Sequence, residues 1–133
     1  MASRERSDDP AQSDLWTNRI IGAAIEVHKE LGPGLLESIY EECLAHVLNG
    51  QGIMVQRQVE VPNVFRGREL AVKHRVDLMV ESSVVVEIKS CERLLPVHEA
   101  QLLTYLRMTG CRIGLLLNFN VAFLKDGIVR RVL

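Results

Sequence analysis

The sequence predicts an α/β (α+β) fold in which helices flank a mixed β-sheet, and three observations support this prediction. Apolar residues recur at intervals of three and four between residues 13 and 48, and they alternate with polar residues over 53–61 and 70–81. Short apolar runs stand at Val84–Val86 and Leu115–Leu117. The first spacing is typical of a helix face and the second of a half-buried strand. Short apolar runs suit strands covered on both faces.

Composition places the chain among ordinary globular proteins. Of its 133 residues, 47% are apolar and 25% charged, so it can bury a core without disulfides. It lacks the ~20 consecutive apolar residues of a membrane span and has no apolar signal core. We therefore expect a cytoplasmic protein without a membrane partner. Its three cysteines show no CxxC spacing and favour neither a disulfide framework nor a zinc site.

Charge is unevenly distributed along the sequence. Residues 1–50 contain 4 basic and 9 acidic side chains, whereas residues 51–133 contain 12 basic and 8 acidic ones. The excess in the second part suits an anionic substrate held by local phosphate contacts. It is too small to predict a broad nucleic-acid-binding surface.

Two helices open the predicted domain, 13–133, after a flexible polar tail at 1–12. Ser13 is the expected N-cap of the first helix, which ends at Gly32-Pro33-Gly34 because proline cannot continue a helix. A second helix is expected over 35–48. Its inward face is predicted to consist of Leu36, Ile39, Cys43, Leu44 and Val47.

The rest of the chain adds strands and one more helix, giving the order α-α-β-β-β-α-β-β. Pro62-Asn63 is expected to close the first strand, and Asp126-Gly127 to turn a short terminal hairpin. Ala100, Leu102, Leu103 and Leu106 should form the packing face of the third helix. The predicted elements are strands at 53–61, 70–81, 84–91 and 113–119, a helix from Pro96 to Gly110, and the terminal hairpin over 121–133.

Hydrophobic register places two acids opposite each other on the second and third strands. A three-residue loop at 81–83 would pair Val80 with Val84, set Asp77 opposite Glu87 and keep the apolar rows on one face. The inward residues of the second strand would be Leu70, Val72, Val76, Leu78 and Val80. The same register sets Arg75 opposite Lys89, a like-charge pair that is unfavourable without an anion or acid between them.

These charges suit metal-assisted cleavage of a phosphodiester. Carboxylates such as Asp77 and Glu87 can gather Mg²⁺ while leaving positions for water and substrate. Lys89, two residues beyond Glu87, points to the same face and can orient the attacking water or stabilise phosphate charge. Glu37 is a candidate third acid, although it would equally favour the positive end of its own helix.

Three further side chains are candidates for the same cleft. Gln101 and Tyr105 lie four residues apart on one side of the third helix, where they would touch phosphate or orient Lys89. Their alternative is an ordinary helix surface. His28 would be the natural nitrogen ligand if Glu37 were not used, although a histidine on a helix more often packs or caps.

Several ordered motifs resemble a known family. Residues 34–40, Gly-Leu-Leu-Glu-Ser-Ile-Tyr, match the signature of the bacterial GxxExxY proteins. The similarity continues through 75–78, 86–90, 96–106 and 114–119, and so spans nearly the whole chain after the tail. That family resembles a compact member of the PD-(D/E)XK nuclease superfamily, which implies a restriction-endonuclease-like core with a mixed sheet flanked by helices.

The resemblance also implies roles for individual residues. By position, Asp77 matches the aspartate of the motif, Glu87 its second acid and Lys89 its lysine. Glu37 is similar to the acid on the helix before the core. Gln101 and Tyr105 are similar to the QxxxY pair of exonuclease-like branches. Val76 stands where the superfamily has a proline, which shapes the backbone and contributes no chemistry.

The leading hypothesis is therefore a Mg²⁺-dependent nuclease acting on DNA, with Mn²⁺ as a substitute. Asp77, Glu87 and Glu37 would bind metal, with the Ile88 carbonyl as an extra ligand, and Lys89 would position the nucleophile. Two alternatives stay open: a catalytically silent module that binds nucleic acid or a protein, and a structural charge cluster at an oligomer interface. Any sequence preference would have to come from a partner or a homodimer, since no DNA-binding module is appended.

Overall fold

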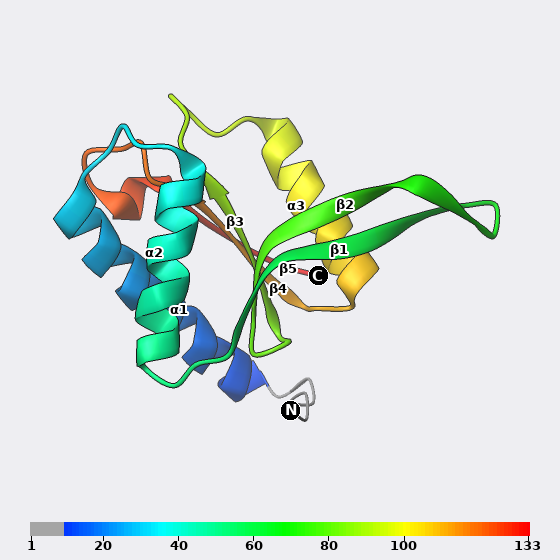
Figure 1. Ribbon diagram of the computed structural model, residues 1–133, viewed down its shortest axis with the longest axis horizontal. Coiled ribbons are helices and arrows are strands. Elements are labelled where there is room, and N and C mark those ends of the chain that lie inside the picture. The colour runs from blue at the N-terminus through cyan, green and yellow to red at the C-terminus, as the bar shows by residue number, and fades with distance from the viewer. Residues whose placement is uncertain (1–9) are drawn as a thin grey trace.

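A five-stranded mixed sheet forms the centre of the fold, and helices cover both of its faces (Figure 1). The computed structural model describes residues 10–133. Sheet order follows chain order, and all neighbours are antiparallel except β3 and β4. The strands are β1 (Val55–Phe65), β2 (Arg68–Val80), β3 (Val84–Lys89), β4 (Ile113–Asn118) and β5 (Ile128–Val132). The predicted α+β class is thus confirmed.

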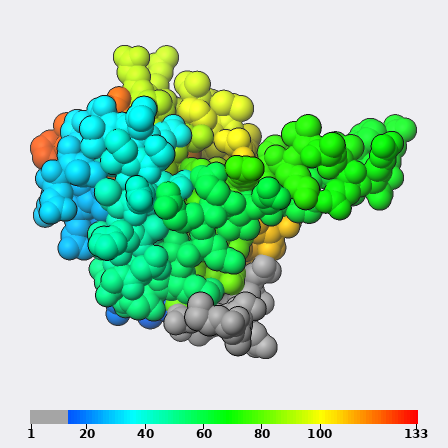
Figure 2. All heavy atoms as spheres, in the orientation of Figure 1, coloured from blue at the N-terminus to red at the C-terminus, as the bar shows by residue number. Residues whose placement is uncertain are grey.

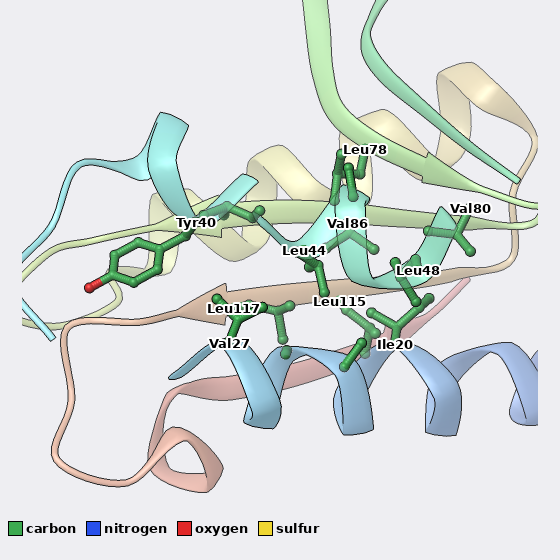
Figure 3. Close-up of a cluster of buried hydrophobic side chains, with 14 of the residues drawn as sticks. Ile20, Val27, Tyr40, Leu44, Leu48, Leu78, Val80, Val86, Leu115 and Leu117 are labelled. Carbon is green, nitrogen blue, oxygen red and sulfur yellow. The ribbon is translucent and has the colours of Figure 1, made fainter. Parts of the chain in front are cut away.

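Two separate apolar cores join the helices to the sheet. Helices α1 (Pro10–Leu31) and α2 (Glu37–Gly50) pack on one face, where Ile20, Leu44 and Leu115 are fully buried (Figure 3). On the other face, α3 (Pro96–Thr109) packs through Leu102, Tyr105 and Leu106. Because α3 connects the parallel strands β3 and β4, it must cross over the sheet face. Among the described helices, none is long and apolar enough to cross a membrane.

The ends and buried faces of the helices differ in part from the prediction. α1 ends at Leu31 as predicted, but it begins at Pro10, so Ser13 lies inside the helix and is not its N-cap. Residues 1–9 of the predicted tail lie outside the described part of the chain. The predicted third helix is confirmed as α3, which runs from Pro96 to a left-handed Gly110 cap, although Ala100 is exposed and not part of its packing face.

The buried face of α2 is rotated relative to the prediction. Leu36 and Ile39 are predicted to point inward, but they are 70% and 39% exposed. The buried apolar stripe is Tyr40, Leu44 and Leu48, at helical spacing of four. Tyr40 determines this orientation, because its ring stacks on buried Phe119 with centroids 4.4 Å apart.

β1 and β2 continue well beyond the point at which the sequence predicts a break. Proline at 62 does not end β1, because β1 is an edge strand that tolerates a missing donor. The strands run on to a two-residue turn, Arg66-Gly67, with φ of 51° and 75°. Positive φ at both positions is the geometry of a tight hairpin turn. The outer part of this hairpin projects from the body (Figure 2).

The predicted terminal hairpin over 121–133 is wrong. β5 is a single strand that pairs directly with β4, with Leu117 opposite Ile128 and Ile113 opposite Val132. A short 3-10 helix, η1 (Leu124–Gly127), occupies the place of the expected first strand. Gly127 permits this packing, since a Cβ there would overlap the main-chain oxygen of Asn118.

Gly127→Ala should therefore destabilise the protein, whereas Gly22→Ala should not. The added methyl at 127 meets main chain, which cannot rotate away, and we expect a loss of about 1–3 kcal/mol. Gly22 is exposed inside α1, and a Cβ added there would have no neighbour within 4 Å, so alanine should add about 0.5–1 kcal/mol. Urea denaturation followed by circular dichroism compares the two. Equal stabilities would contradict the tight approach of η1 to β4.

Candidate active site

The predicted acids meet where the ladder between β2 and β3 ends. The register is the predicted one, with Val80 paired to Val84 and Leu78 to Val86. Beyond Leu78, hydrogen bonds between side chains and main chain replace the backbone hydrogen bonds that join the two strands. The Asp77 N–H donates to Glu87 Oε2 at 2.7 Å, and the Ile88 N–H donates to Asp77 Oδ2 at 2.8 Å. Each carboxyl group is therefore anchored to the main chain of the opposite strand.

The backbone changes direction at this point, which corrects the expectation of a single apolar row on β2. Val76 packs in the core beneath α3, whereas Leu78 and Val80 pack beneath α1 and α2. Strict alternation would have placed all three on one face. The side chains therefore change faces at Asp77, and this residue lies at the junction between the two cores.

A matching irregularity lies on β1. Arg57 pairs with Leu78 and Val59 with Val76, while Gln58 between them has a φ of 50°. A left-handed backbone at a residue other than glycine costs of order 1–3 kcal/mol and often marks a functional site. The distortion brings the amide group of Gln58 beside Asp77, with Nε2 at 3.3 Å from Oδ1.

The predicted opposition of Arg75 and Lys89 is also wrong. Because the β2–β3 ladder ends at Leu78, the two cations are not held opposite each other. Arg75 instead pairs with Glu60 across β1, with Nη2 and Oε1 3.7 Å apart. Lys89 is the last residue of β3, half-buried and opposite Asn118 of β4.

Burial and like charge alter the electrostatics of the acids. Glu87 is only 4% exposed, and its burial, followed by the negative charge of Asp77, raises its pKa to about 8. The charge of Lys89 acts in the opposite direction. The Glu87 carboxyl group therefore keeps its proton near neutral pH unless an additional positive charge lies beside it.

This donor set fits a hard divalent cation. Asp77 and Glu87 supply carboxylate oxygens, the ligands that Mg²⁺ and Mn²⁺ prefer. Two acids in contact at a buried position, one with a strongly raised pKa, form a place where positive charge would be stabilising. The Ile88 carbonyl belongs to the same strand segment. No group of three histidine, cysteine or acidic side chains within residues 10–133 is close enough to hold a metal.

Glu37 lies near this segment without joining the acid pair. It is exposed in the first turn of α2, and its Oε1 is 3.4 Å from the Ser90 N–H, directly after Lys89. The Ser90 hydroxyl donates to the Leu35 carbonyl at 2.6 Å. The start of α2 is thereby attached to the end of β3, beside a cavity of about 440 Å³ lined by Ser90, Leu36 and Ile39.

A helix acid that sequence reasoning missed is connected to Asp77. Glu41, one turn after Glu37, is 5% exposed and accepts hydrogen bonds from Arg57 at 3.1 Å and Gln58 at 2.6 Å. Because the same Gln58 nitrogen lies near Asp77, the amide bridges the two carboxylates. The i, i+4 spacing of Glu37 and Glu41 was the available signal, but the distortion of β1 that creates the bridge has no sequence signature.

The predicted pair on α3 forms a wall beside the acids. Tyr105 is 3% exposed, and its pKa is raised first by burial and then by the charges of Glu87 and Asp77. The Gln101 side chain acts in the opposite direction and lowers the pKa of Tyr105. The ring of His74 on β2 meets the Tyr105 ring edge-on at 5.5 Å, a contact that sequence reasoning also missed.

His28 lies in a different environment. Its Nε2 is 2.8 Å from the Val121 carbonyl oxygen, and the ring lines a pocket of about 500 Å³ with Lys29, Phe123 and Lys125. None of the predicted site acids lines this pocket. The geometry thus gives His28 a structural contact between α1 and the segment before η1.

Asn118 fixes the chain that follows Lys89. The side chain is 2% exposed, and it accepts from the Cys91 N–H at 3.1 Å and donates to the Cys91 carbonyl at 3.0 Å. A paired amide of this kind imitates a strand partner. It extends the β3–β4 connection past the last backbone pair, Lys89 with Asn118, and so restrains the position of Lys89.

Comparison with known proteins agrees with this architecture. The solved crystal structure of SSO0001 is similar with a TM-score of 0.51 and 23% sequence identity, over 90% of this chain and 59% of that chain. At this identity the likeness concerns the fold alone, and the chain spans about 59% of the length of SSO0001. No curated protein matches the sequence.

A comparison with protein families gives a match over nearly the whole chain. Residues 14–132 match the PD-(D/E)XK nuclease superfamily. The matched range includes the acid pair, Lys89 and the Gln101/Tyr105 wall. The finer resemblance to the GxxExxY proteins stays a prediction. This match agrees with the fold, a mixed sheet in which the two acids lie at the end of the β2–β3 ladder. The chain therefore belongs to the PD-(D/E)XK nuclease superfamily.

Proposed function

We propose that this protein is a Mg²⁺-dependent nuclease that hydrolyses phosphodiester bonds of DNA. The observation that supports it most is the contact between Asp77 and buried Glu87 at the point where the β2–β3 ladder ends. A carboxyl group whose pKa is raised by its own burial and by a neighbouring acid, as in Glu87, is typical of a functional site. Membership in a nuclease superfamily supplies the same chemistry independently.

The chain's own residues have separate roles in this proposal. Asp77 and Glu87 would hold the divalent cation, with the Ile88 carbonyl and Glu37 as further candidate ligands. The cation would supply positive charge to the phosphate and lower the pKa of a bound water. Lys89 would orient the attacking water or stabilise the growing negative charge. Gln101 and Tyr105 would line the cleft and support Lys89.

A catalytically silent binding module is the second candidate. It is favoured by the position of Glu37, which is not close enough to Asp77 and Glu87 to complete a three-acid cluster among residues 10–133. Such a module would bind nucleic acid or a protein partner without turnover. A purely structural charge cluster is disfavoured, because Asp77 and the burial of Glu87 together make ionised Glu87 unfavourable.

Cleavage assays test the leading proposal. Lys89→Ala and Asp77→Ala should each lower cleavage of single-stranded, duplex or branched DNA by about 10²-fold or more, since each would remove charge placed at the reacting phosphate. Lys125→Ala and Asp126→Ala are matched controls, because both side chains are exposed on η1. Equal activity in all five proteins would rule out the assignment. DNA binding without cleavage or Mg²⁺ affinity would support the silent module.

The raised pKa of Glu87 predicts how stability depends on pH without metal. Between about 4.5 and 8 the folded state keeps a proton that the unfolded state releases, so the free energy of unfolding should fall as pH rises. In chelator at pH 8, Glu87→Gln should be more stable than wild type by about 1–3 kcal/mol, and the difference should vanish near pH 5. Urea denaturation from pH 5 to 9 measures this. Parallel pH curves for the two proteins would contradict it.

The Glu41–Gln58 bridge should matter for activity more than for folding. Gln58→Ala removes the amide beside Asp77 and should lower cleavage about 10–100-fold, as is usual for groups that orient a metal ligand. Gln56→Ala, two residues earlier and also exposed on β1, is the matched control and should stay near wild type. The measurements are Mg²⁺ affinity by calorimetry and cleavage rate. Equal behaviour of the two glutamine variants would show that the bridge has no role.

A further inference from the structure

The outer part of the β1–β2 hairpin, residues 62–73, forms an arm with no packing partner in the described chain. Every residue of the arm is exposed except Asn63, whose side-chain amide donates to the Val72 carbonyl at 2.9 Å. The space-filling view shows the arm standing clear of the body (Figure 2). Its exposed apolar side chains include Val64 at 63%, Phe65 at 61% and Val72 at 73%. Side chains of this kind on an isolated ribbon indicate a contact surface.

The arm is positively charged at its tip. Residues 62–73 contain three basic side chains, Arg66, Arg68 and Lys73, and one acidic side chain, Glu69. Lys73 lies 3.8 Å from Glu60, while neither Arg66 nor Arg68 forms a salt bridge with any residue in the described part of the chain. The Arg66 guanidinium lies over the Phe65 ring, 5.1 Å from its centroid. The two tip arginines are thus available to an anionic partner.

The arm is continuous with the candidate active site. β2 contains both Asp77 and, nine residues earlier, Arg68, so the arm tip lies about 30 Å from the acids at the usual rise of a strand. That span equals about nine base pairs of B-form DNA. A duplex whose phosphate reached Asp77 and Glu87 would therefore meet the arm about one helical turn away.

We propose that the arm binds duplex DNA roughly one turn from the cleavage site; this rests on the proposed nuclease function. A two-stranded β-ribbon fits the major groove of B-DNA, which is about 12 Å wide. Arg66 and Arg68 contact phosphates at the tip, and Phe65 and Val64 contact sugars or thymine methyl groups. The preferred substrate is therefore a duplex that is long enough to reach from the active site to the arm.

Charge and shape favour this occupant over others. Two arms packed against each other would bring their arginines together, so a second copy is disfavoured at the tip. Double-stranded RNA has a deep, narrow major groove that does not admit a ribbon. A duplex with B-form geometry satisfies both the cationic tip and the exposed apolar side chains.

Binding in chelator tests the arm without cleavage. The probes are a fluorescent 30-base-pair DNA, a hairpin with a stem of about 7 base pairs, which is shorter than the proposed span, and a single strand of 30 nucleotides. The double variant Arg66→Ala/Arg68→Ala removes the tip charges. Arg19→Ala/Lys29→Ala removes the same charge from exposed positions on α1 and is the matched control. Circular dichroism confirms that all proteins are folded.

We expect the tip variant to bind the long duplex on the order of 10-fold more weakly at 0.1 M salt, with a salt slope smaller by about 2. It should bind the short stem and the single strand nearly as well as wild type, and the α1 control should match wild type on every probe. Equal losses on long and short duplexes, or in the control, would overturn the arm proposal while leaving the nuclease proposal intact. Two further results would also overturn the arm proposal. One is stronger binding of a duplex RNA of the same length, added as a fourth probe in the same assay. The other is a dimer, detected by light scattering, that the variant Phe65→Ser converts to a monomer. A wild-type protein that neither binds nor cuts any nucleic acid would overturn both.

Discussion

The structure depends on how the main chain is satisfied where β2 and β3 separate. Two carboxyl groups accept the N–H groups of Asp77 and Ile88, which would otherwise lose their sheet partners. A buried N–H without a partner costs about 1–3 kcal/mol, so the acids have a structural role as well as a chemical one. The separation also lets β2 change faces at Asp77, so that Val76 and Leu78 enter different cores.

The same arrangement creates an electrostatic conflict that explains the surrounding residues. Glu87 must be buried to reach the Asp77 N–H, yet burial beside another acid raises its pKa to about 8. Gln58 donates toward both Asp77 and Glu41. Arg57 forms a salt bridge with Glu41, whereas neither Asp77 nor Glu87 forms one within residues 10–133. Glu87 therefore keeps its proton near neutral pH until a cation lies beside the acid pair. The preference for a cation follows from the fold and not only from the identities of two side chains.

The sequence predicts those features of the fold and the site that depend on interactions between residues close together in the chain. The register of β2 and β3 was predicted correctly, because a one-residue slip would have put the two acids on opposite faces and buried a mixed row of charged and apolar side chains. Helical spacing likewise predicted that Gln101 and Tyr105 share one side of α3, but it left open whether that side lies beside the acids. The left-handed Gln58, the face change at Asp77 and the rotated α2 were not predictable. Each depends on a tertiary contact, such as Tyr40 on Phe119, that no local pattern records.

The arm shows why the distortion at the acids has consequences beyond them. A long exposed ribbon at the edge of a sheet is an aggregation risk, and proteins restrain such edges with charges, proline and bulges. β1 has Pro62, a register shift between Pro62 and Val64, and cations at the tip. These features protect the edge without shortening it, although a shorter hairpin would have removed the risk altogether. The length of the hairpin therefore needs an explanation. The arm continues directly from Asp77, because β2 contains both this acid and Arg68, and Arg66 lies in the turn next to it. A detached loop would not connect the arginines to the acid in this way.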